Sequence, residues 1–346
     1  MQTLSRGIEE QVNPEKREIS RVSWSVLAIM RFYLAVMVVF YHVPFFCAST
    51  DIAVKISKFL PGYAAVLVFM LISGYSIAHS AATQPKGFYL RRIERVFPVY
   101  LASIVLACLG WAIYGPAPVS AVGLFEAPAS VWTVVANFFM LQGTLTDHLQ
   151  TNQVTWSLSI ECLFYLFAPL FTRTSTRNLL ILWAVSALLY LIPAAFHLPE
   201  PNSSKYGLGA IMLLWSWLIG FLIYRHQSES WVWILALVSG GFLISHYDLG
   251  VCVYSGYMYT LAVVVIMMVK TLPAWLNKIS GYLGDLSYPL YLVHFPTMLL
   301  LACSGRTAPS WLLVLGAVIM TLLVYHVIDK PYRSKLKKAR MVSELS

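Results

Sequence analysis

Charged residues are scarce in this sequence. Only 11% of its 346 residues are charged and 59% are hydrophobic, whereas a soluble domain carries roughly 25% charged residues. A thick soluble core cannot explain the difference, because single cores stop growing near about 250–300 residues. Apolar runs long enough to cross a hydrocarbon layer of about 30 Å recur along the whole chain. The composition therefore predicts an all-α integral membrane protein without a second, polar domain.

Cysteine motifs are also missing. The sequence has no Cys-x-x-Cys pair and no cluster of histidine with cysteine, so we expect neither a disulfide framework nor a metal site. The five cysteines are scattered, mostly within apolar runs, at Cys47, Cys108, Cys162, Cys252 and Cys303. The net charge of +9 lies at the ends of the apolar runs and not on one face, which argues against nucleic acid as a partner.

The apolar runs predict a bundle of about ten transmembrane helices. The first run has no evident small-residue cleavage site, so we interpret it as a true first helix and not as a removed signal. The segment 131–142 is apolar but short, and we expect it to be interfacial or re-entrant within a long loop, 115–153. The expected spans are 24–46, 62–82, 97–114, 154–172, 179–196, 208–224, 231–247, 253–270, 280–301 and 310–328.

The basic residues predict the orientation of the bundle. With ten spans, nineteen of the 24 lysines and arginines fall on one side, and cytoplasmic loops carry such an excess. Both termini are therefore expected in the cytoplasm of a multi-pass protein of the cell inner membrane. We divide the chain into a cytoplasmic segment (1–23), one transmembrane domain (24–328) and a basic cytoplasmic tail (329–346). The other loops are short, so any chemistry must take place within the bundle.

Ionisable residues inside the first span need an explanation, because each costs roughly 2.5–3.5 kcal/mol at the centre of a membrane helix. Arg31 and His42 are eleven residues apart, which is about three helical turns and about 16 Å. They project to the same face but cannot touch. An inner cation and an outer imidazole along one cavity suit an anionic donor whose reactive end points outward. The alternative is a snorkelling Arg31 and a structural His42.

Three arginines precede the third span. Arg91, Arg92 and Arg95 lie in an inner loop just before a helix that we expect to start near Pro98. Guanidinium groups can bind phosphates in a bidentate manner, and helix N-termini favour anions. The alternative function of this cluster is an ordinary positively charged anchor of the helix.

Three further polar stretches lie within spans. Ser73 and Gly74, followed by Tyr75, favour close helix packing. Glu161, between Trp156 and Tyr165, lies in the same outer half as His42, where it could orient the imidazole, bind an acceptor hydroxyl or pair structurally with Arg31. Two prolines and a glycine predict that the helix at 283–296 is irregular and faces a cavity. Its polar residues are Asp285, Ser287, Tyr288, Tyr291 and His294.

Together these residues resemble acyltransferase family 3, the integral-membrane O-acyltransferases. The resemblance covers nearly the whole chain, and at the end of the last span Asp329 stands where the family typically has glutamate. It rests on five motifs in the expected order: Arg31-(ten residues)-His42, Ser73-Gly74-Tyr75, Arg92-x-x-Arg95-x-x-Pro98-x-Tyr100, Trp156-x-Leu158-x-x-Glu161-x-x-Phe164-Tyr165 and Leu283-Gly284-x-x-Ser287-Tyr288-x-x-Tyr291-Leu292-x-His294.

The resemblance implies that an acyl group, most often acetyl, moves from cytoplasmic acyl-CoA to a sugar hydroxyl of a lipid-linked or surface polysaccharide. No permanently bound cofactor is implied; polysaccharide-assembly proteins are possible partners besides membrane lipid. The implied catalytic residues are His42, Arg31 and Glu161. The donor-binding residues are Arg91, Arg92, Arg95, Ser73, Gly74 and Tyr75. Those that bind the acceptor or support the site are Trp156, Tyr165, Asp285, Ser287, Tyr288, Tyr291, His294 and Asp329.

Two mechanisms fit these residues. In one, His42 deprotonates the acceptor hydroxyl for direct attack on the thioester, which we slightly prefer; in the other, His42 is transiently acylated. A proton-coupled transporter or lipid-linked sugar flippase is the alternative function, with His42, Glu161, Asp285 and His294 as a proton relay. A relay has no need of a phosphate clamp, and a non-catalytic assembly subunit leaves the intramembrane charges unexplained.

Overall fold

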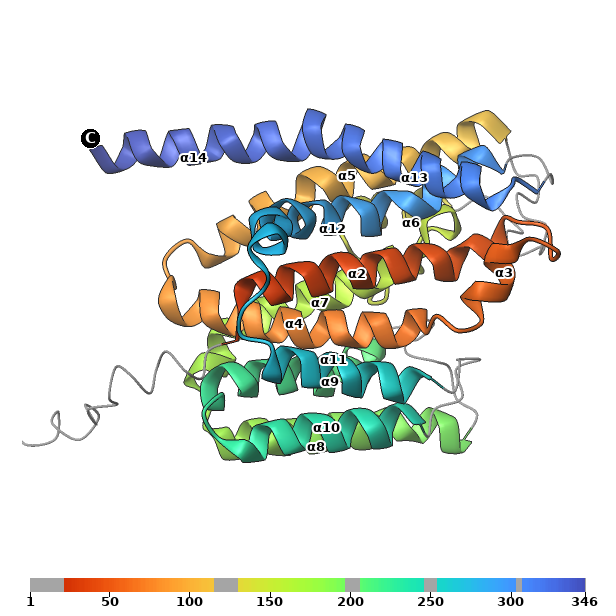
Figure 1. Ribbon diagram of the computed structural model, residues 1–346. Helices are drawn as coiled ribbons and strands as arrows, with labels where there is room; N and C mark the ends of the chain where they lie inside the picture. The colour runs from red at the N-terminus through yellow and green to blue at the C-terminus, as the bar shows by residue number, and fades with distance from the viewer. Residues whose placement is uncertain (1–21, 115–129, 197–205, 246–253, 303–306, 346) are drawn as a thin grey trace, which may run out of the picture.

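The computed structural model describes residues 22–114, 130–196, 206–245, 254–302 and 307–345. Over these residues the chain is helical and has no strand, and the long helices lie side by side (Figure 1). The elements are α2 (Trp24–His42), η1 (Val43–Phe45), α3 (Ile52–Ser57), α4 (Gly62–Thr83), α5 (Phe88–Tyr114), α6 (Val131–Phe138), η2 (Gln150–Asn152), α7 (Thr155–Arg173), α8 (Thr176–Phe196), α9 (Leu208–His226), α10 (Ser230–Ser245), α11 (Ser255–Met268), α12 (Ala274–Leu301), α13 (Ser310–Val324), η3 (Tyr325–Asp329) and α14 (Lys330–Leu345).

Each of the ten expected spans coincides with one helix of the bundle. These helices are α2, α4, α5, α7, α8, α9, α10, α11, α12 and α13. A helical bundle satisfies every backbone hydrogen bond within the spanning segments, as a membrane requires. In the described part of the chain, six helical stretches are long and apolar enough to cross a membrane; α8, α10 and α11 contain shorter apolar stretches. The six are Trp24–Phe45, Gly62–Thr83, Phe88–Gly110, Thr155–Arg173, Leu208–His226 and Ser310–Arg340. The protein is therefore a multi-pass membrane protein.

Two boundaries differ from the sequence prediction. The third helix does not begin near Pro98: α5 starts at Phe88 and continues through the proline, so the three arginines lie on its first turns and not in a loop. Nothing in residues 88–97 interrupts a helix, and membrane helices tolerate an internal proline where neighbouring groups take up the backbone group that it frees. The basic tail is helical as well, because α14 follows α13 through the π-helical turn η3.

The irregularity expected at 283–296 is absent, since α12 is continuous through Pro289 and Pro296. A proline has no N–H for the carbonyl four residues earlier, which leaves the carbonyl of Leu292 without its helical partner at Pro296. The side chain of Asn152 donates to this carbonyl at 3.3 Å. A buried amide from η2 thus replaces the missing backbone donor.

The segment that we expected to be interfacial or re-entrant contains α6, which has eight residues and a length of about 12 Å. It is too short to span a membrane. The chain after it enters the bundle, where the buried Gln142 donates to the carbonyl of Thr155 at 3.1 Å and to the hydroxyl of Tyr100 at 3.1 Å. The expected N-terminal segment 1–23 and residues 115–129 of the long loop lie almost entirely outside the described residues.

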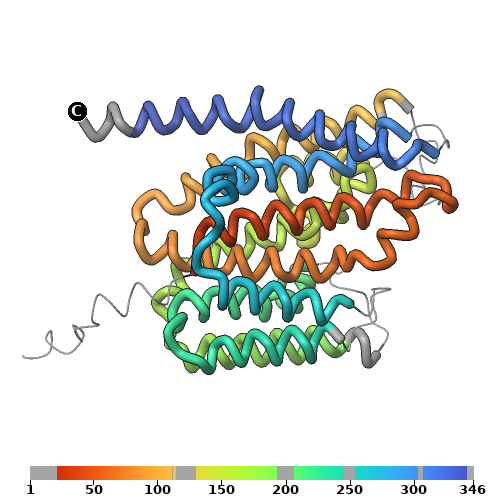
Figure 2. The backbone as a smooth tube through the Cα atoms, in the orientation of Figure 1, coloured from red at the N-terminus to blue at the C-terminus, as the bar shows by residue number. Residues whose placement is uncertain are grey.

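One side of the bundle consists of α8, α9, α10 and α11, and the opposite side consists of α5, α12 and α13. Helices α2, α4 and α7 lie between the two sides (Figures 1 and 2). Helices α2 and α12 pack against each other, and a Cβ added at Gly284 would overlap that of Ala28. The turn between α4 and α5 lies at the end of the bundle from which α14 projects (Figure 1). This end is the one predicted to be cytoplasmic.

Helices α4 and α9 approach each other through two glycines. A Cβ added at Gly74 would overlap the carbonyl oxygen of Trp217, and one added at Gly220 would overlap that of Leu71. Small residues let membrane helices pack at backbone distance. Both side chains next to this contact, Trp217 and Tyr75, are buried. The contact fixes α4, which lies in the middle of the bundle, against α9.

Substitution of Gly220 by alanine is expected to destabilise the protein by about 1–3 kcal/mol, because overpacking forces the backbones apart. Gly281→Ala is the matched control: a Cβ there meets nothing within 4 Å, and alanine favours a helix by up to about 1 kcal/mol over glycine. Thermal unfolding of both variants in detergent measures the difference. Equal midpoints for the two variants would show that the α4–α9 contact can relax without cost.

Candidate active site

Two histidines from opposite parts of the chain meet between α2 and α12. The Nδ1 atom of His42, the last residue of α2, lies 3.1 Å from the Nε2 atom of His294. Each Nδ1 atom also lies 2.9 Å from a carbonyl oxygen one turn earlier, that of Val38 for His42 and that of Leu290 for His294. The sequence separation of 252 residues between the rings is closed by the packing of α2 on α12.

The hydrogens on the ring nitrogens are assigned from these contacts. A carbonyl oxygen only accepts, so the Nδ1 atoms of both neutral rings are donors. The Nε2 atom of His294 is then an acceptor, and it shares the Nδ1 hydrogen of His42 with the carbonyl of Val38. The Nε2 atom of His42 is left with its lone pair and has no partner among the described residues. This tautomer can accept a proton or attack a carbonyl carbon.

Aromatic rings hold the His42 imidazole in place. The rings of Tyr41, Phe45 and Phe295 have centroids 5.1, 5.7 and 5.2 Å from that of His42. The ring of Tyr291 lies 6.4 Å from that of His294. Tyr291 is also a wall of the internal cavity, and it therefore connects the histidine pair with that cavity.

The internal cavity has a volume of about 150 Å³ and lies between α2, α4, α5, α7 and α12. Most of the polar residues singled out in the sequence contribute to its wall, although they come from five helices. Neither histidine belongs to the wall. The polar lining residues are Arg31, Ser73, Ser76, Arg92, Arg95, Ser157, Glu161, Tyr165, Ser287, Tyr288 and Tyr291.

Arg31 and Glu161 place two opposite charges on this wall. The carboxylate of Glu161 accepts from the hydroxyl of Tyr165 at 2.5 Å and has the hydroxyl of Ser73 beside it. The Nε atom of Arg31 is buried without a hydrogen-bond partner. An unpaired buried donor is costly, so this atom can bind a carbonyl or phosphoryl oxygen of a molecule in the cavity. The imidazole partner of His42 is His294 and not Glu161.

The three arginines of α5 have different surroundings. Arg91 donates to the carbonyl oxygens of Lys86 and Gln84 and so holds the α4–α5 turn. Arg92 donates to the hydroxyl of Ser80 at 2.8 Å, and its Nε atom is buried without a partner. Arg92 and Arg95 line the internal cavity, whereas Arg91 does not.

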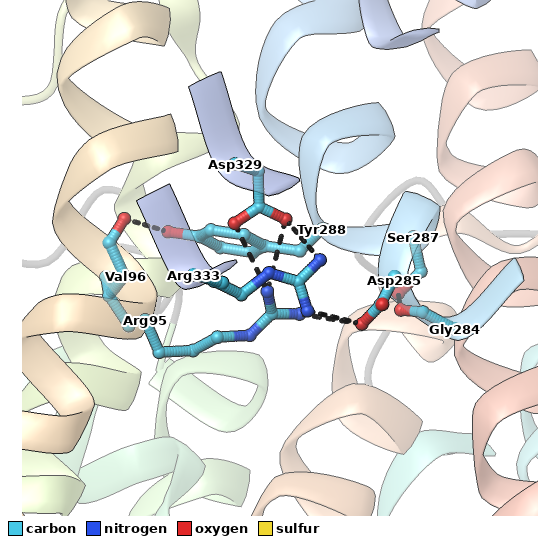
Figure 3. Close-up of polar contacts among 8 residues, drawn as sticks. All are labelled: Arg95, Val96, Gly284, Asp285, Ser287, Tyr288, Asp329 and Arg333. Atoms are coloured by element: carbon cyan, nitrogen blue, oxygen red, sulfur yellow. Dashed lines mark hydrogen bonds and ion pairs between the residues drawn. The ribbon is translucent and has the colours of Figure 1, made fainter. Parts of the chain in front are cut away.

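Arg95 belongs to a cluster of four charges (Figure 3). Its guanidinium lies 3.3 Å from Asp329 and 3.9 Å from Asp285. Arg333 binds the same two carboxylates more closely, at 2.8 Å each. Beside the cluster, Tyr288 donates to the carbonyl of Val96 at 2.7 Å. Each carboxylate therefore contacts two guanidinium groups, and Arg333 supplies the shorter ion pair to both.

Arg333 was not identified from the sequence, although its spacing to Asp329 was a signal. The two residues are four apart and therefore neighbours on one helical face. The π-helical turn η3 contains Asp329, which is 1% exposed. Turns of this kind are frequent at functional sites.

Besides the two histidines, Arg91, Asp285 and Asp329, three expected site residues do not line the cavity: Gly74, Tyr75 and Trp156. Gly74 lies in the α4–α9 contact, and the hydroxyl of Tyr75 donates to the side chain of Gln227 at 3.3 Å. Both therefore pack α4 against α9 instead of contacting a donor in this cavity. The ring of Trp156 is stacked on that of Tyr63, with centroids 6.3 Å apart.

Two further polar residues of α12 form hydrogen bonds at the cavity wall. The hydroxyl of Ser287 donates to the carbonyl of Gly284 at 2.6 Å, and the hydroxyls of Tyr291 and Ser157 lie 2.6 Å apart. Within the described residues, no group of three or more histidine, cysteine or acidic side chains could hold a metal ion.

Fold and site together define a class: a multi-pass helical membrane protein with a polar cavity between a basic end and a histidine pair. The model of the acyltransferase domain family matches residues 25–328. Since this match covers most of the chain, the protein belongs to that family of membrane acyltransferases.

Curated relatives agree with this assignment. The chain is 24% identical to the ORF330 protein of Acidianus two-tailed virus, over 78% of this chain and 81% of the relative. It is 24% identical to Nodulation protein 10 of Rhizobium leguminosarum bv. viciae, over 81% and 84%. It is also 24% identical to the peptidoglycan O-acetyltransferase OatA of Listeria monocytogenes, over 79% of this chain and 51% of OatA. No solved structure matches the chain.

The two carboxylates of the four-charge cluster are expected to differ in their effect on stability. Asp329→Asn removes a buried charge between two arginines. Its cost should exceed about 1 kcal/mol but stay below the roughly 3–5 kcal/mol of a fully buried pair, because both arginines are about 30% exposed. Asp285 is 37% exposed, and Asp285→Asn should cost at most about 1 kcal/mol. Thermal unfolding in detergent tests this order; a larger loss from Asp285→Asn would contradict it.

Proposed function

We propose that the protein is an acyl-CoA-dependent O-acyltransferase of the cell inner membrane. It transfers an acyl group, most often acetyl, to a hydroxyl of a lipid-linked or surface polysaccharide sugar. The observation that carries the proposal is the pair of contacts that the Nδ1 atom of His42 makes with the carbonyl of Val38 and with His294; they assign the ring hydrogen to Nδ1 and leave the Nε2 lone pair unpartnered. The family of the chain favours this reaction over the transport alternative.

In the proposed reaction, the Nε2 atom of His42 accepts the proton of the acceptor hydroxyl. The hydroxyl oxygen forms a bond to the thioester carbonyl carbon, and the carbon–sulfur bond breaks. The leaving thiolate then takes the proton from the imidazolium, so that free coenzyme A and the ester are the products. The positive charge on His42 is stabilised meanwhile, because its Nδ1 hydrogen faces two acceptors, the carbonyl of Val38 and the ring of His294.

Arg31 and Glu161 have a different part in this proposal. Arg31 lies about 16 Å from His42 along α2, and it lines the cavity that His42 does not line. It cannot contact the atoms that react at His42. We assign Arg31 and Glu161 to the donor arm, whose amides would bind the unpaired Nε atom of Arg31 and the polar wall around it.

His42→Ala is expected to lower the rate of acyl transfer by about 10²–10⁴-fold, which is the usual contribution of a general base. The control is His326→Ala. His326 is exposed on η3, away from the cavity, and its Nε2 atom lies 3.4 Å from the hydroxyl of Tyr282. Release of free thiol from acetyl-CoA in the presence of acceptor, with protein abundance measured in parallel, gives the rates. Activity of His42→Ala within tenfold of the wild type would refute the role of this residue.

The proposal also requires a donor site that faces the cytoplasm. We propose ten spans with both termini inside, a single transmembrane domain at 24–328, a cytoplasmic segment at 1–23 and a cytoplasmic tail at 329–346. A fluorescent cytoplasmic reporter fused after Ser346 should be active, and a periplasmic phosphatase fused at that position should not. The same phosphatase inserted within 115–129 should be active. The opposite pattern would place the basic end outside and exclude a cytoplasmic donor.

A further inference from the structure

A groove lined mainly by basic residues runs between α5 and α14 at the end of the bundle predicted to be cytoplasmic. Its volume is about 590 Å³, which is within the range of about 300–1,000 Å³ that small-molecule sites have. Helix α5 contributes three arginines and an acid, and α14 contributes three basic residues and a leucine. The lining residues are Arg91, Arg92, Glu94, Arg95, Arg333, Leu336, Lys337 and Arg340.

The register of α14 decides which of its many cations line the groove. Arg333, Lys337 and Arg340 are four and three residues apart and so share one helical face. This face is turned toward α5, where Arg340 forms an ion pair with Glu94. Lys335 and Lys338 are exposed and are not part of the groove wall.

The charges of the groove are only partly neutralised. Arg340 is paired with Glu94, and Arg95 and Arg333 share the carboxylates of Asp285 and Asp329. The other cations lack a carboxylate partner among the described residues: Arg91 binds backbone carbonyls and Arg92 binds a serine hydroxyl. Lys337, on the facing wall, has none either. Three cations, two on α5 and one on α14, thus face the groove without a carboxylate partner among the described residues.

Like charges on facing walls repel each other, and α14 has few other contacts with the bundle beyond η3 and α5. An anion with several charges would remove this repulsion. The groove adjoins the internal cavity, because Arg92 and Arg95 line both. These two arginines are therefore the point at which a ligand of the groove would come nearest to the cavity that Arg31 lines.

We propose that the groove binds the phosphorylated nucleotide part of the donor, with α14 as its second wall and Lys337 as a phosphate ligand. This proposal rests on the proposed function and adds the location of the nucleotide. A phosphomonoester carries about −1.5 to −2 charges at pH 7, and the diphosphate bridge of coenzyme A adds to this. The ligand can therefore compensate the charges of Arg91, Arg92 and Lys337, which have no carboxylate partner among the described residues. The thiol-bearing arm enters the cavity past Arg92 and Arg95.

The test is binding of coenzyme A to the full-length protein purified in detergent, measured by calorimetry. Lys337→Glu should raise the dissociation constant at least tenfold. Lys338→Glu changes the net charge of the same helix equally but alters a side chain outside the groove, and it should change the dissociation constant less than threefold. In acyl transfer, Lys337→Glu should raise the KM for acetyl-CoA and leave the rate with acetyl-pantetheine, which has no nucleotide, unchanged.

Three outcomes would overturn the inference. Equal affinities of the two variants would mean that the helix acts only by its net charge. Equal loss of rate with acetyl-CoA and acetyl-pantetheine would mean that Lys337 does not bind the nucleotide. If Lys337→Glu weakens only the association with vesicles containing phosphatidylglycerol, the groove binds a lipid headgroup instead. Failure of the wild type to transfer from acetyl-CoA would refute the proposed function itself, and that result is distinct from all three.

Discussion

The ion pairs of Arg333 with Asp285 and Asp329 connect parts of the chain on which the site depends. Asp285 belongs to α12, Asp329 to the turn η3 and Arg95, which lies against both carboxylates, to α5. Charges in a membrane bundle must be compensated within the protein, and here four of them compensate one another at the boundary between the groove and the cavity. Because Arg333 holds both acids at 2.8 Å, Arg95 can turn to a ligand without leaving either acid unpaired.

The sequence was sufficient to predict the helices because their signal is local. Ten long apolar runs each coincide with a helix, and the short 131–142 segment contains only the eight-residue helix α6. Helix boundaries in polar stretches were less accurate. The extension of α5 to Phe88 and the helical tail were missed, since arginine-rich turns at a membrane surface look alike as loop and as helix. Pro289 and Pro296 suggested a broken helix, and only the distant Asn152 shows why α12 remains continuous.

The sequence predicted which residues line the cavity better than it predicted the contacts between site residues. Arg31, Glu161 and Tyr165 were singled out because polar side chains in apolar runs are rare, and they share one wall. The contact of His42 with His294 could not be read from spacing, because 252 residues separate them and only the packing of α2 on α12 brings them together. Gly74 illustrates the converse: its small size predicted close helix packing while the family resemblance implied donor binding, and the backbone of α9 occupies the space beside it.

The distance between Arg31 and His42 constrains how a reaction can be organised in this bundle. One small molecule cannot contact both residues unless it is elongated, because about 16 Å of helix separates them. The narrow cavity, with polar groups at several levels, suits an extended arm that carries amides, and it leaves the aromatic surroundings of His42 for the acceptor. In the proposed reaction, a donor bound in this way would enter from the basic end, and the hydroxyl would approach from the other. The two substrates would then meet only at the Nε2 atom of His42. Such an arrangement would favour direct transfer over a relay, since the acceptor would not have to wait for coenzyme A to leave.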